Sequence, residues 1–336
     1  MKKLNIAVAG VGNRAKSGVI PAVLSGDKFT INTLCDVSEE NLKAVSGLFE
    51  RAPVCTGDYT KVLADPDIDG VVVITPNYLH AQMAAAALKA GKPVYLEKPI
   101  GISVQDCKVV CDTAKETGVP LMVGMQLRYN NVFNKMKELL TQGYIGALRI
   151  INYTQFREPL RDGWDNWRKD KSKSGGSILE VSVHHLDLFH WFSEGAEVKI
   201  FALGGGDVIK NETGMLDNIL FSLEYDNGVR ADIEAILFAK DGNHPRNGMY
   251  LFGSGGYMTV KGNSIIVTRM SGETETVAVE AADSTAAALD GFYEYIVNGK
   301  KPMITPEDGF RAVAAGLAAE RSIETGKAVR LSEIMI

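Results

Sequence analysis

Residues 4–15 read LNIAVAGVGNRA, a short apolar run that leads into two glycines and a small residue. The apolar run predicts a buried strand, and the glycines predict a tight turn before a helix. Gly10 permits the turn, Gly12 lets backbone amides approach a phosphate, and Ala15 lets the helix pack closely on the strand. The spacing Gly-x-Gly-x-x-Ala is therefore typical of the turn that holds the pyrophosphate of a dinucleotide.

A second signal stands at the end of the next apolar run. Residues 29–34 lead into Cys35 and Asp36, which places a carboxylate at the tip of the second strand. Such a carboxylate accepts hydrogen bonds from the hydroxyls of an adenosine ribose, and it repels the 2′-phosphate that distinguishes NADP from NAD. The same residues also fit an ordinary glycine-rich turn in which Asp36 caps the helix that begins near Ser38. The spacing of the two signals favours a cofactor site, with NAD preferred over NADP.

The composition limits the classes of protein to which this chain can belong. Its 336 residues suffice for two domains, and a hydrophobic fraction of 46% supplies both with cores. A net charge of -5 and a charged fraction of 23% argue against nucleic acid or an anionic membrane as a partner. No apolar run approaches the length needed to span a bilayer. The four cysteines lack the spacing of a disulfide framework or a zinc site, so we expect reduced thiols, no metal and a cytoplasmic location.

The first part of the chain, which we assign to residues 1–124, alternates short apolar runs with helical stretches. Apolar runs occupy 70–74, 93–96 and 119–123, and an Ala-rich helix is expected at 80–90. Continuously apolar strands separated by helices indicate a parallel sheet that is covered on both faces. We therefore predict an α/β fold whose N-terminal domain is a doubly wound parallel sheet that binds NAD(P).

The apolar period changes to two in the second part of the chain, residues 125–336. Large apolar residues recur at every second position from Ile219 to Tyr225, and Asn227-Gly228 predicts a hairpin turn. Further strands are expected on both sides of the glycine-rich segment 253–256. We predict a substrate and oligomerisation domain with a large, mainly antiparallel open sheet. A closing helix at about 306–325 is expected to pack back on the first domain.

Glu97-Lys98-Pro99 follows an apolar run at the expected carboxyl end of a parallel strand. Ligands of doubly wound proteins bind at this end of the sheet, so Lys98 is expected beside the nicotinamide. A lysine in this place can hydrogen-bond a substrate hydroxyl. A lysine at a strand end is more often simply solvated, but Pro99 fixes the backbone where the chain leaves the sheet, which favours a site.

A second set of candidate residues lies in the segment 174–187. On a helix, Glu180 and His184 are four residues apart and share a face, so the carboxylate can orient the imidazole as an acid/base pair. The same pattern fits a buried, hydrogen-bonded histidine in a first helical turn. A metal site is the third possibility, because Glu180, His184 and His185 are all metal-ligand types. Adjacent histidines on a helix point about 100° apart, so a single ion would use one of them.

Between these two sets, the segment 161–168 mixes aromatic rings with hydrogen-bonding groups. Rings such as Trp164 and Trp167 can cover the apolar face of a sugar, while Asn166 and Arg168 address its hydroxyls. The alternative is a pair of core tryptophans flanked by surface charges. We favour a substrate loop.

Taken together, these motifs resemble those of the Gfo/Idh/MocA family of oxidoreductases. The resemblance extends over essentially the whole chain, and its most specific element is Glu-Lys-Pro at 97–99. Other matching elements are AGVG at 9–12 followed by Arg14, TPN at 75–77 followed by His80, AGKP at 90–93, MQLRYN at 125–130, Trp167-Arg168, the glycine-rich run into His184, and Asp217-Asn218. The resemblance implies a Rossmann domain followed by an α/β domain with an open sheet.

The resemblance also implies which residues carry the function. Lys98 and His184 match the catalytic lysine and histidine of the family, whereas Glu180 stands where its dehydrogenases commonly have aspartate. The implied cofactor-binding residues are Gly10, Gly12, Asn13, Arg14, Asp36, Thr75, Pro76, Asn77, His80, Glu97, Lys98 and Gln126. The expected substrate-binding residues are Arg128, Trp164, Asn166, Trp167, Arg168 and His184.

These inferences lead to one expected function and two alternatives. We expect an NAD-dependent dehydrogenase that transfers hydride between nicotinamide and a hydroxyl-bearing carbon of a sugar, inositol or related polyol. His184 would move the hydroxyl proton and Lys98 would position the oxygen. The alternatives are an NAD-dependent glycosidase that oxidises its substrate transiently, and a non-catalytic sensor of sugar or NAD. The family further implies a homodimer or homotetramer formed through the sheet of the second domain.

Overall fold

The computed structural model describes residues 3–158, 166–206, 208, 214–239 and 244–335. The chain forms two compact units. Unit 1 consists of Met1–Tyr129 and Asp283–Phe310, and unit 2 consists of Asn130–Ala282 and Arg311–Ile336. This division differs from the expected one at residue 124, because the chain returns to unit 1 over the segment 283–310.

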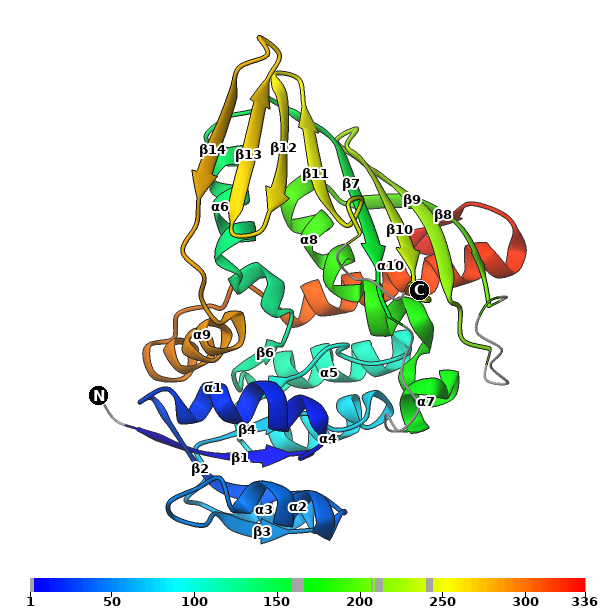
Figure 1. The fold of residues 1–336 in the computed structure, drawn as a ribbon. Coiled ribbons are helices and arrows are strands. Elements are labelled where there is room, and N and C mark those ends of the chain that lie inside the picture. The colour runs from blue at the N-terminus through cyan, green and yellow to red at the C-terminus, as the bar shows by residue number, and fades with distance from the viewer. Residues whose placement is uncertain (1–2, 159–165, 207, 209–213, 240–243, 336) are drawn as a thin grey trace. The chain divides into compact units, whose positions relative to one another are not determined.

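The sheet of unit 1 has six parallel strands in the order β3-β2-β1-β4-β5-β6 (Figure 1). Their bounds are β1 Leu4–Ala9, β2 Phe29–Cys35, β3 Val54–Thr56, β4 Gly70–Val73, β5 Val94–Leu96 and β6 Leu121–Val123. The strand order reverses between β1 and β4, which is the switch point where doubly wound sheets bind nucleotides. The predicted Rossmann architecture is thereby confirmed.

Helices cover this sheet, and their ends follow the local sequence. They are η1 Ala15–Val19, α1 Ile20–Leu24, α2 Glu39–Ser46, α3 Tyr59–Ala64, η2 Asn77–Leu79, α4 His80–Lys89, α5 Val104–Thr117, η3 Gln126–Tyr129, α9 Ser284–Asn298 and the first residues of α10 Pro306–Thr325. Side chains of Ser38, Asp58 and Ser103 cap α2, α3 and α5 by accepting bonds from backbone amides. The helix expected after the glycine turn begins as a π-helical turn, η1.

Helix α9 completes the core of unit 1 from a distant part of the sequence. Phe29 of β2 lies edge-on to Tyr293 with ring centroids 5.7 Å apart, and Tyr95 of β5 lies edge-on to Phe292 at 5.9 Å. Aromatic rings at this separation and angle attract one another in addition to the area they bury. These contacts explain why residues 283–310 belong to unit 1.

Unit 2 contains a nine-stranded sheet in the order β14-β13-β12-β11-β7-β10-β9-β8-β15. The bounds are β7 Leu148–Phe156, β8 Glu197–Gly205, β9 Asn218–Tyr225, β10 Arg230–Ile236, β11 Gly248–Gly253, β12 Gly256–Lys261, β13 Ser264–Arg269, β14 Thr274–Ala278 and β15 Val329–Arg330. The sheet is mainly antiparallel, as predicted, and the hairpin at Asn227-Gly228 joins β9 to β10. The pair β7 and β10 is parallel, so the sheet is mixed.

One face of this sheet is buried by helices and the other is open. The helices are α6 Asn131–Thr141, η4 Asn166–Lys169, α7 Lys171–Ser174, η5 Ile178–Ser182, α8 Val183–Ser193, the rest of α10, and η6 Leu331–Glu333. Helix α8 packs against β7, and the residues from Ile219 to Tyr225 that alternate toward this side are buried. Their neighbour Leu220 points the other way and is 51% exposed.

Among the helices that the structure describes, none has the length and hydropathy required to cross a bilayer.

Candidate active site

The glycine turn after β1 has the shape expected of a phosphate cradle. Gly10 has φ of +90°, and a Cβ at this position would lie 2.5 Å from the carbonyl oxygen of Ile74. Any side chain would therefore collide with the strand next to it, which explains the glycine. Gly12 and Asn13, which follow, are at least partly exposed, so the backbone of the turn is open to a ligand.

Asp36 closes this turn from the end of β2. Its Oδ2 accepts a hydrogen bond from the amide of Val11 at 2.7 Å, and its Oδ1 accepts one from the amide of Ser38 at 2.8 Å. The cap of α2 is Ser38 rather than Asp36, because the Ser38 hydroxyl accepts from the Asn41 amide. Each carboxylate oxygen keeps further acceptor capacity after one bond, so Asp36 can still accept a ribose hydroxyl.

Arg14 lies in the turn and connects it to other predicted cofactor residues. Its Nε donates to Oε1 of Glu97 at 2.8 Å, and its Nη2 donates to Oε1 of Gln126 and to Oγ1 of Thr285. A Cβ at Gly18 would collide with Nη1 of Arg14, so glycine makes room for this arrangement. Burial is the largest single influence and lowers the pKa of the Arg14 guanidinium, but Glu97, Tyr95 and Asp283 together outweigh it, so the pKa is raised.

Glu97 holds the segment that carries Lys98. The Glu97 side chain is buried, and its Oε2 accepts a hydrogen bond from the amide of Lys98 at 3.2 Å. One carboxylate therefore binds the guanidinium of Arg14 and the backbone at Lys98. The structure places Lys98 directly after β5, at the carboxyl edge of the sheet that also carries the glycine turn.

Residues 75–80 follow β4 at the same edge of the sheet. The hydroxyl oxygen of Thr75 is buried and has no hydrogen-bond partner among the described residues. Buried hydroxyls without a partner are uncommon, and this one fits a site that a ligand completes. Together with the cradle at Gly10 and the carboxylate of Asp36, it shows that the residues of unit 1 fit a dinucleotide.

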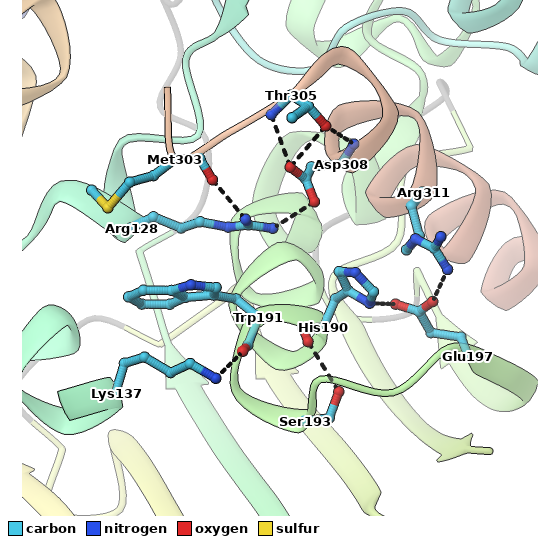
Figure 2. A network of polar contacts seen from close by, with 10 residues as sticks. All are labelled: Arg128, Lys137, His190, Trp191, Ser193, Glu197, Met303, Thr305, Asp308 and Arg311. Atoms are coloured by element: carbon cyan, nitrogen blue, oxygen red, sulfur yellow. Dashed lines mark hydrogen bonds and ion pairs between the residues drawn. The ribbon is translucent and has the colours of Figure 1, made fainter. Parts of the chain in front are cut away.

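His80 and Arg128 have surroundings that the sequence did not indicate. Both ring nitrogens of His80 face backbone carbonyl oxygens of unit 1, those of Thr75 and Pro99. Arg128 donates from Nη1 to the carbonyl of Met303 at 2.9 Å and from Nη2 to Oδ1 of Asp308 at 3.1 Å (Figure 2). Arg128 therefore anchors the segment that leads into α10.

The candidate residues of unit 2 meet around Glu180. Nη1 of Arg168 lies 3.0 Å from Oε1 of Glu180, whose side chain is buried. This ion pair joins the predicted substrate segment to the predicted acid/base segment. The guanidinium of Arg168 also lies 5.0 Å from the ring centre of Trp167, within the range of a cation-π contact. Trp164 lies outside the described residues, and Asn166 is the first residue of η4.

The two adjacent histidines of α8 have different surroundings, as their helical positions require. His184 is half-buried, whereas His185 is buried and stacks on Tyr153 with ring centroids 3.9 Å apart. Glu180 belongs to the π-helical η5, so its spacing to His184 crosses the boundary between a π-helix and an α-helix. Such π-helical turns occur frequently at functional sites.

Within the described ranges, no group of three or more His, Cys, Asp or Glu is arranged to hold a metal ion.

A further polar cluster in unit 2 was not indicated by the sequence. Glu197 is buried at the start of β8, with Oε1 3.3 Å from Nδ1 of His190 and Oε2 3.3 Å from Nη1 of Arg311 (Figure 2). The cluster ties α8 to β8 and α10. It therefore supports the helix that carries His184. Its three residues are separated by 7 to more than 100 positions along the chain, and no local motif marks them.

Comparison with known proteins places this geometry in context. A model of the oxidoreductase family with an NAD-binding Rossmann fold matches residues 4–125, and a model of the GFO/IDH/MocA C-terminal domain matches residues 133–259. The chain is 26% identical over 347 residues to myo-inositol 2-dehydrogenase of Thermotoga maritima, covering 99% of this chain and 100% of that protein. It is 28% identical over 285 residues to scyllo-inositol 2-dehydrogenase (NAD(+)) of Bacillus subtilis, covering 82% and 81%. The structure of aldose-aldose oxidoreductase from Caulobacter crescentus shares the fold, with a TM-score of 0.88, 23% identity, and coverage of 98% and 100%.

Proposed function

The chain belongs to the Gfo/Idh/MocA family of NAD-binding oxidoreductases, and we propose that it oxidises a hydroxyl-bearing carbon of an inositol, a sugar or a related polyol. The observation that carries this proposal is the contact of Glu97 with both Arg14 and the backbone at Lys98. It ties the phosphate-binding turn to the segment that carries the proposed substrate-binding lysine. Two relatives named as inositol dehydrogenases support the substrate class.

NAD is the proposed cofactor, and its nicotinamide supplies the hydride acceptor when it is bound. Asp36 stands where the adenosine ribose is expected, and its charge disfavours a 2′-phosphate. Arg14, a cation in the glycine turn, binds Glu97 and Gln126. It is therefore engaged inside unit 1 instead of being directed at the ribose end of a cofactor.

The proposed chemistry uses His184 as the acid/base group and Lys98 as a substrate-binding group. His184 takes the proton of a substrate hydroxyl, and Lys98 hydrogen-bonds and orients a substrate oxygen. Glu180 and Arg168 form an ion pair next to the start of α8, and we propose that this pair positions that helix. Trp164, Asn166 and Trp167 complete the proposed substrate set, with stacking for the rings and a hydrogen bond for the amide.

The direct test is a panel of inositols, other polyols, aldoses and sugar glycosides with NAD and purified protein. Absorbance of the reduced cofactor and release of product are followed in the same samples. We expect net formation of reduced cofactor in equal amount to a ketone or lactone. Product release from glycosides without net reduction of NAD would instead identify an NAD-dependent glycosidase and contradict the proposal. Binding without turnover on the whole panel would identify a sensor.

The open face of the sheet in unit 2 is proposed to pair with a second copy of the chain. Its exposed apolar residues come from two pairs of neighbouring strands, β11 with β7 and β9 with β8, and β10 lies between the two pairs. Phe252 lies opposite Ile150, and Leu220 lies opposite Leu203. The exposed apolar side chains on this face are Ile150, Phe201, Leu203, Leu220 and Phe252. Exposed apolar side chains that gather on one face of a sheet mark an interface more often than an isolated residue does.

Light scattering after size-exclusion chromatography tests this pairing. Leu220→Asp places a charge within the patch and is expected to convert a dimer or tetramer to smaller species. Met270→Asp changes an exposed apolar residue in the turn that follows β13, so it serves as the matched control. A wild-type protein that is monomeric at micromolar concentration would contradict the proposed interface.

The location proposed for the enzyme is the cytoplasm. All four cysteines are free, and burial raises the pKa of Cys35 to about 11, so this thiol is unreactive at neutral pH. Free thiols agree with a reducing compartment. Localisation of a tagged chain tests the proposal.

A further inference from the structure

His80 lies at the first position of α4 and is almost completely buried. Its Nδ1 lies 2.6 Å from the carbonyl oxygen of Pro99, and its Nε2 lies 2.8 Å from the carbonyl oxygen of Thr75. One side chain thus touches the segments that leave β4 and β5. Both segments stand at the edge of the sheet where the cofactor is proposed to bind.

We propose that His80 is a positioning residue whose two ring nitrogens control separate parts of the site. The Nδ1 side holds Pro99 and, through it, the backbone of Lys98. The Nε2 side holds Thr75 and, through it, the cofactor segment 75–77. This inference rests on the proposed function, because it assigns Lys98 to the substrate and residues 75–77 to NAD.

The buried position makes these contacts consequential. Each of the two backbone carbonyls accepts a hydrogen bond from water in the unfolded chain. Leaving either carbonyl without a partner inside the folded protein is therefore unfavourable. The side-chain hydroxyl of the same residue, Thr75, is buried without a partner among the described residues. A small shift of Thr75 would therefore move a group that we expect to face the cofactor.

The chemistry of imidazole explains why a histidine suits this position. A ring with protons on both nitrogens donates to both carbonyls, whereas a neutral ring has one N–H and donates to one of them. The pKa of His80 is lowered on balance: burial is the largest cause and Lys98 adds to it, while the carbonyls of Pro99 and Thr75 and the carboxylate of Glu97 act in the opposite direction. An amide side chain carries its NH₂ donor at one distance from the backbone. Replacing His80 with an amide residue can therefore keep one of the two contacts and remove the other.

Two substitutions divide the roles. The amide nitrogen of Asn reaches close to the position of Nδ1, and that of the longer Gln reaches close to the position of Nε2. His80→Asn therefore retains a donor for Pro99, and His80→Gln retains a donor for Thr75. Ala85→Gly, a buried site on the same helix, is the matched control that lowers stability without removing either contact.

The first readout is affinity for NAD alone, measured by isothermal titration calorimetry. We expect His80→Asn to weaken NAD binding by roughly 3- to 10-fold, the effect of one hydrogen bond, and His80→Gln to leave it near the wild-type value. The second readout is turnover of the best polyol at saturating NAD. There we expect His80→Gln to lower kcat by roughly 10- to 100-fold, the scale of a displaced reacting group, and His80→Asn to lower it less.

The third readout does not depend on activity. Hydrogen-deuterium exchange of the free protein is expected to rise over residues 98–102 in His80→Gln and over residues 75–79 in His80→Asn. Ala85→Gly should produce neither local change. A wild-type protein that binds NAD but oxidises no polyol would refute the proposed function, while the NAD and exchange readouts would still decide the role of His80. Equal effects of the two variants, or lower melting temperatures with unchanged affinity, kcat and exchange, would overturn the positioning role.

Discussion

Nε of Arg14 lies 2.8 Å from Oε1 of Glu97, so a single ion pair joins the glycine turn after β1 to the end of β5. The Glu97 side chain is 6% exposed and that of Arg14 is 27% exposed. Removing the carboxylate would leave the guanidinium partly buried without its main partner. The pair therefore contributes both to stability and to the shape of the cofactor site.

Glu97→Ala is expected to lower the free energy of unfolding by about 2 kcal/mol, below the range for fully buried pairs because Arg14 is partly exposed. It should also weaken NAD binding, since the turn and the Lys98 segment lose their shared anchor. Urea unfolding and calorimetry measure the two effects. Glu39→Ala, which removes the exposed pair between Glu39 and Lys43, is the control and should cost less than about 0.5 kcal/mol. Unchanged NAD affinity in a folded Glu97→Ala protein would contradict the prediction.

Asp36→Ala is expected to narrow the preference for NAD over NADP. The carboxylate that repels the 2′-phosphate is lost, and a clash of this kind is worth about 1 to 3 kcal/mol. The ratio of kcat/KM for the two cofactors measures it. Because Asp36 also accepts from the amides of Val11 and Ser38, some stability is lost as well. Ser38→Ala removes the cap of α2 and should lower stability by about 1 kcal/mol without changing the cofactor ratio. Equal efficiency of the wild type with NADP would show that Asp36 does not select NAD.

Lys98→Met and His184→Ala are each expected to slow turnover by roughly 10²- to 10⁴-fold, the contribution of a positioned acid/base group. Affinity for NAD should change little, because neither the Lys98 nor the His184 side chain is proposed as the main contact with NAD. Steady-state kinetics beside calorimetry with NAD separates the two quantities. If Lys98→Met turns over at the wild-type rate, the proposed location of the active site is wrong.

Arg168→Met and Glu180→Gln are expected to destabilise the protein singly and to compensate for each other when combined. Arg168→Met leaves a buried carboxylate without this partner, whereas the double variant removes both charges. A coupling free energy of about 1 to 3 kcal/mol is expected from a double-mutant cycle. If the effects of the two substitutions on the free energy of unfolding are additive, the ion pair contributes nothing to stability. Glu180→Gln should also reduce turnover less than His184→Ala does.

Asp308 gives unit 1 a dependence on acid pH. Burial raises the pKa of its carboxyl, but Arg128 and the amide and hydroxyl of Thr305 outweigh burial and hold it below its ordinary value of 3.8. A carboxyl whose folded pKa is depressed contributes stability above its unfolded pKa and loses it as pH falls through the folded pKa. Asp308→Asn should therefore flatten the fall in unfolding free energy below about pH 4. Urea unfolding between pH 3 and 6 measures this slope, and an unchanged slope would exclude Asp308 as a cause.

The parts of the fold that rest on local patterns were predictable from the sequence. Alternation from Ile219 to Tyr225 and the turn at Asn227-Gly228 predicted a hairpin. Continuously apolar runs separated by helical stretches predicted the parallel sheet. Helix α9 was not placed, because its packing on Phe29 depends on a contact more than 260 positions away. Periodicity alone carries no information about such a partner.

The candidate site was predictable as a set of residues, but not as a set of contacts. The motif residues Arg14, Glu97 and Gln126 were all expected at the cofactor, whereas their hydrogen bonds to one another arise from three different strand ends. Gly18 offered a local signal, since glycine is unfavourable within a helix unless space is needed. The partners of Arg128 gave no such signal, because Met303 and Asp308 follow it by more than 170 positions.

Hydride transfer from a polyol carbon to NAD can be followed with deuterium. Inositol that carries deuterium on all six ring carbons is incubated with the enzyme and NAD, and both products are examined by mass spectrometry. We expect one deuterium in each molecule of reduced cofactor and an equal amount of ketone, with both products forming roughly 10²- to 10⁴-fold more slowly in Lys98→Met. Reduced cofactor without deuterium, or ketone formed without reduction of NAD, would contradict this expectation.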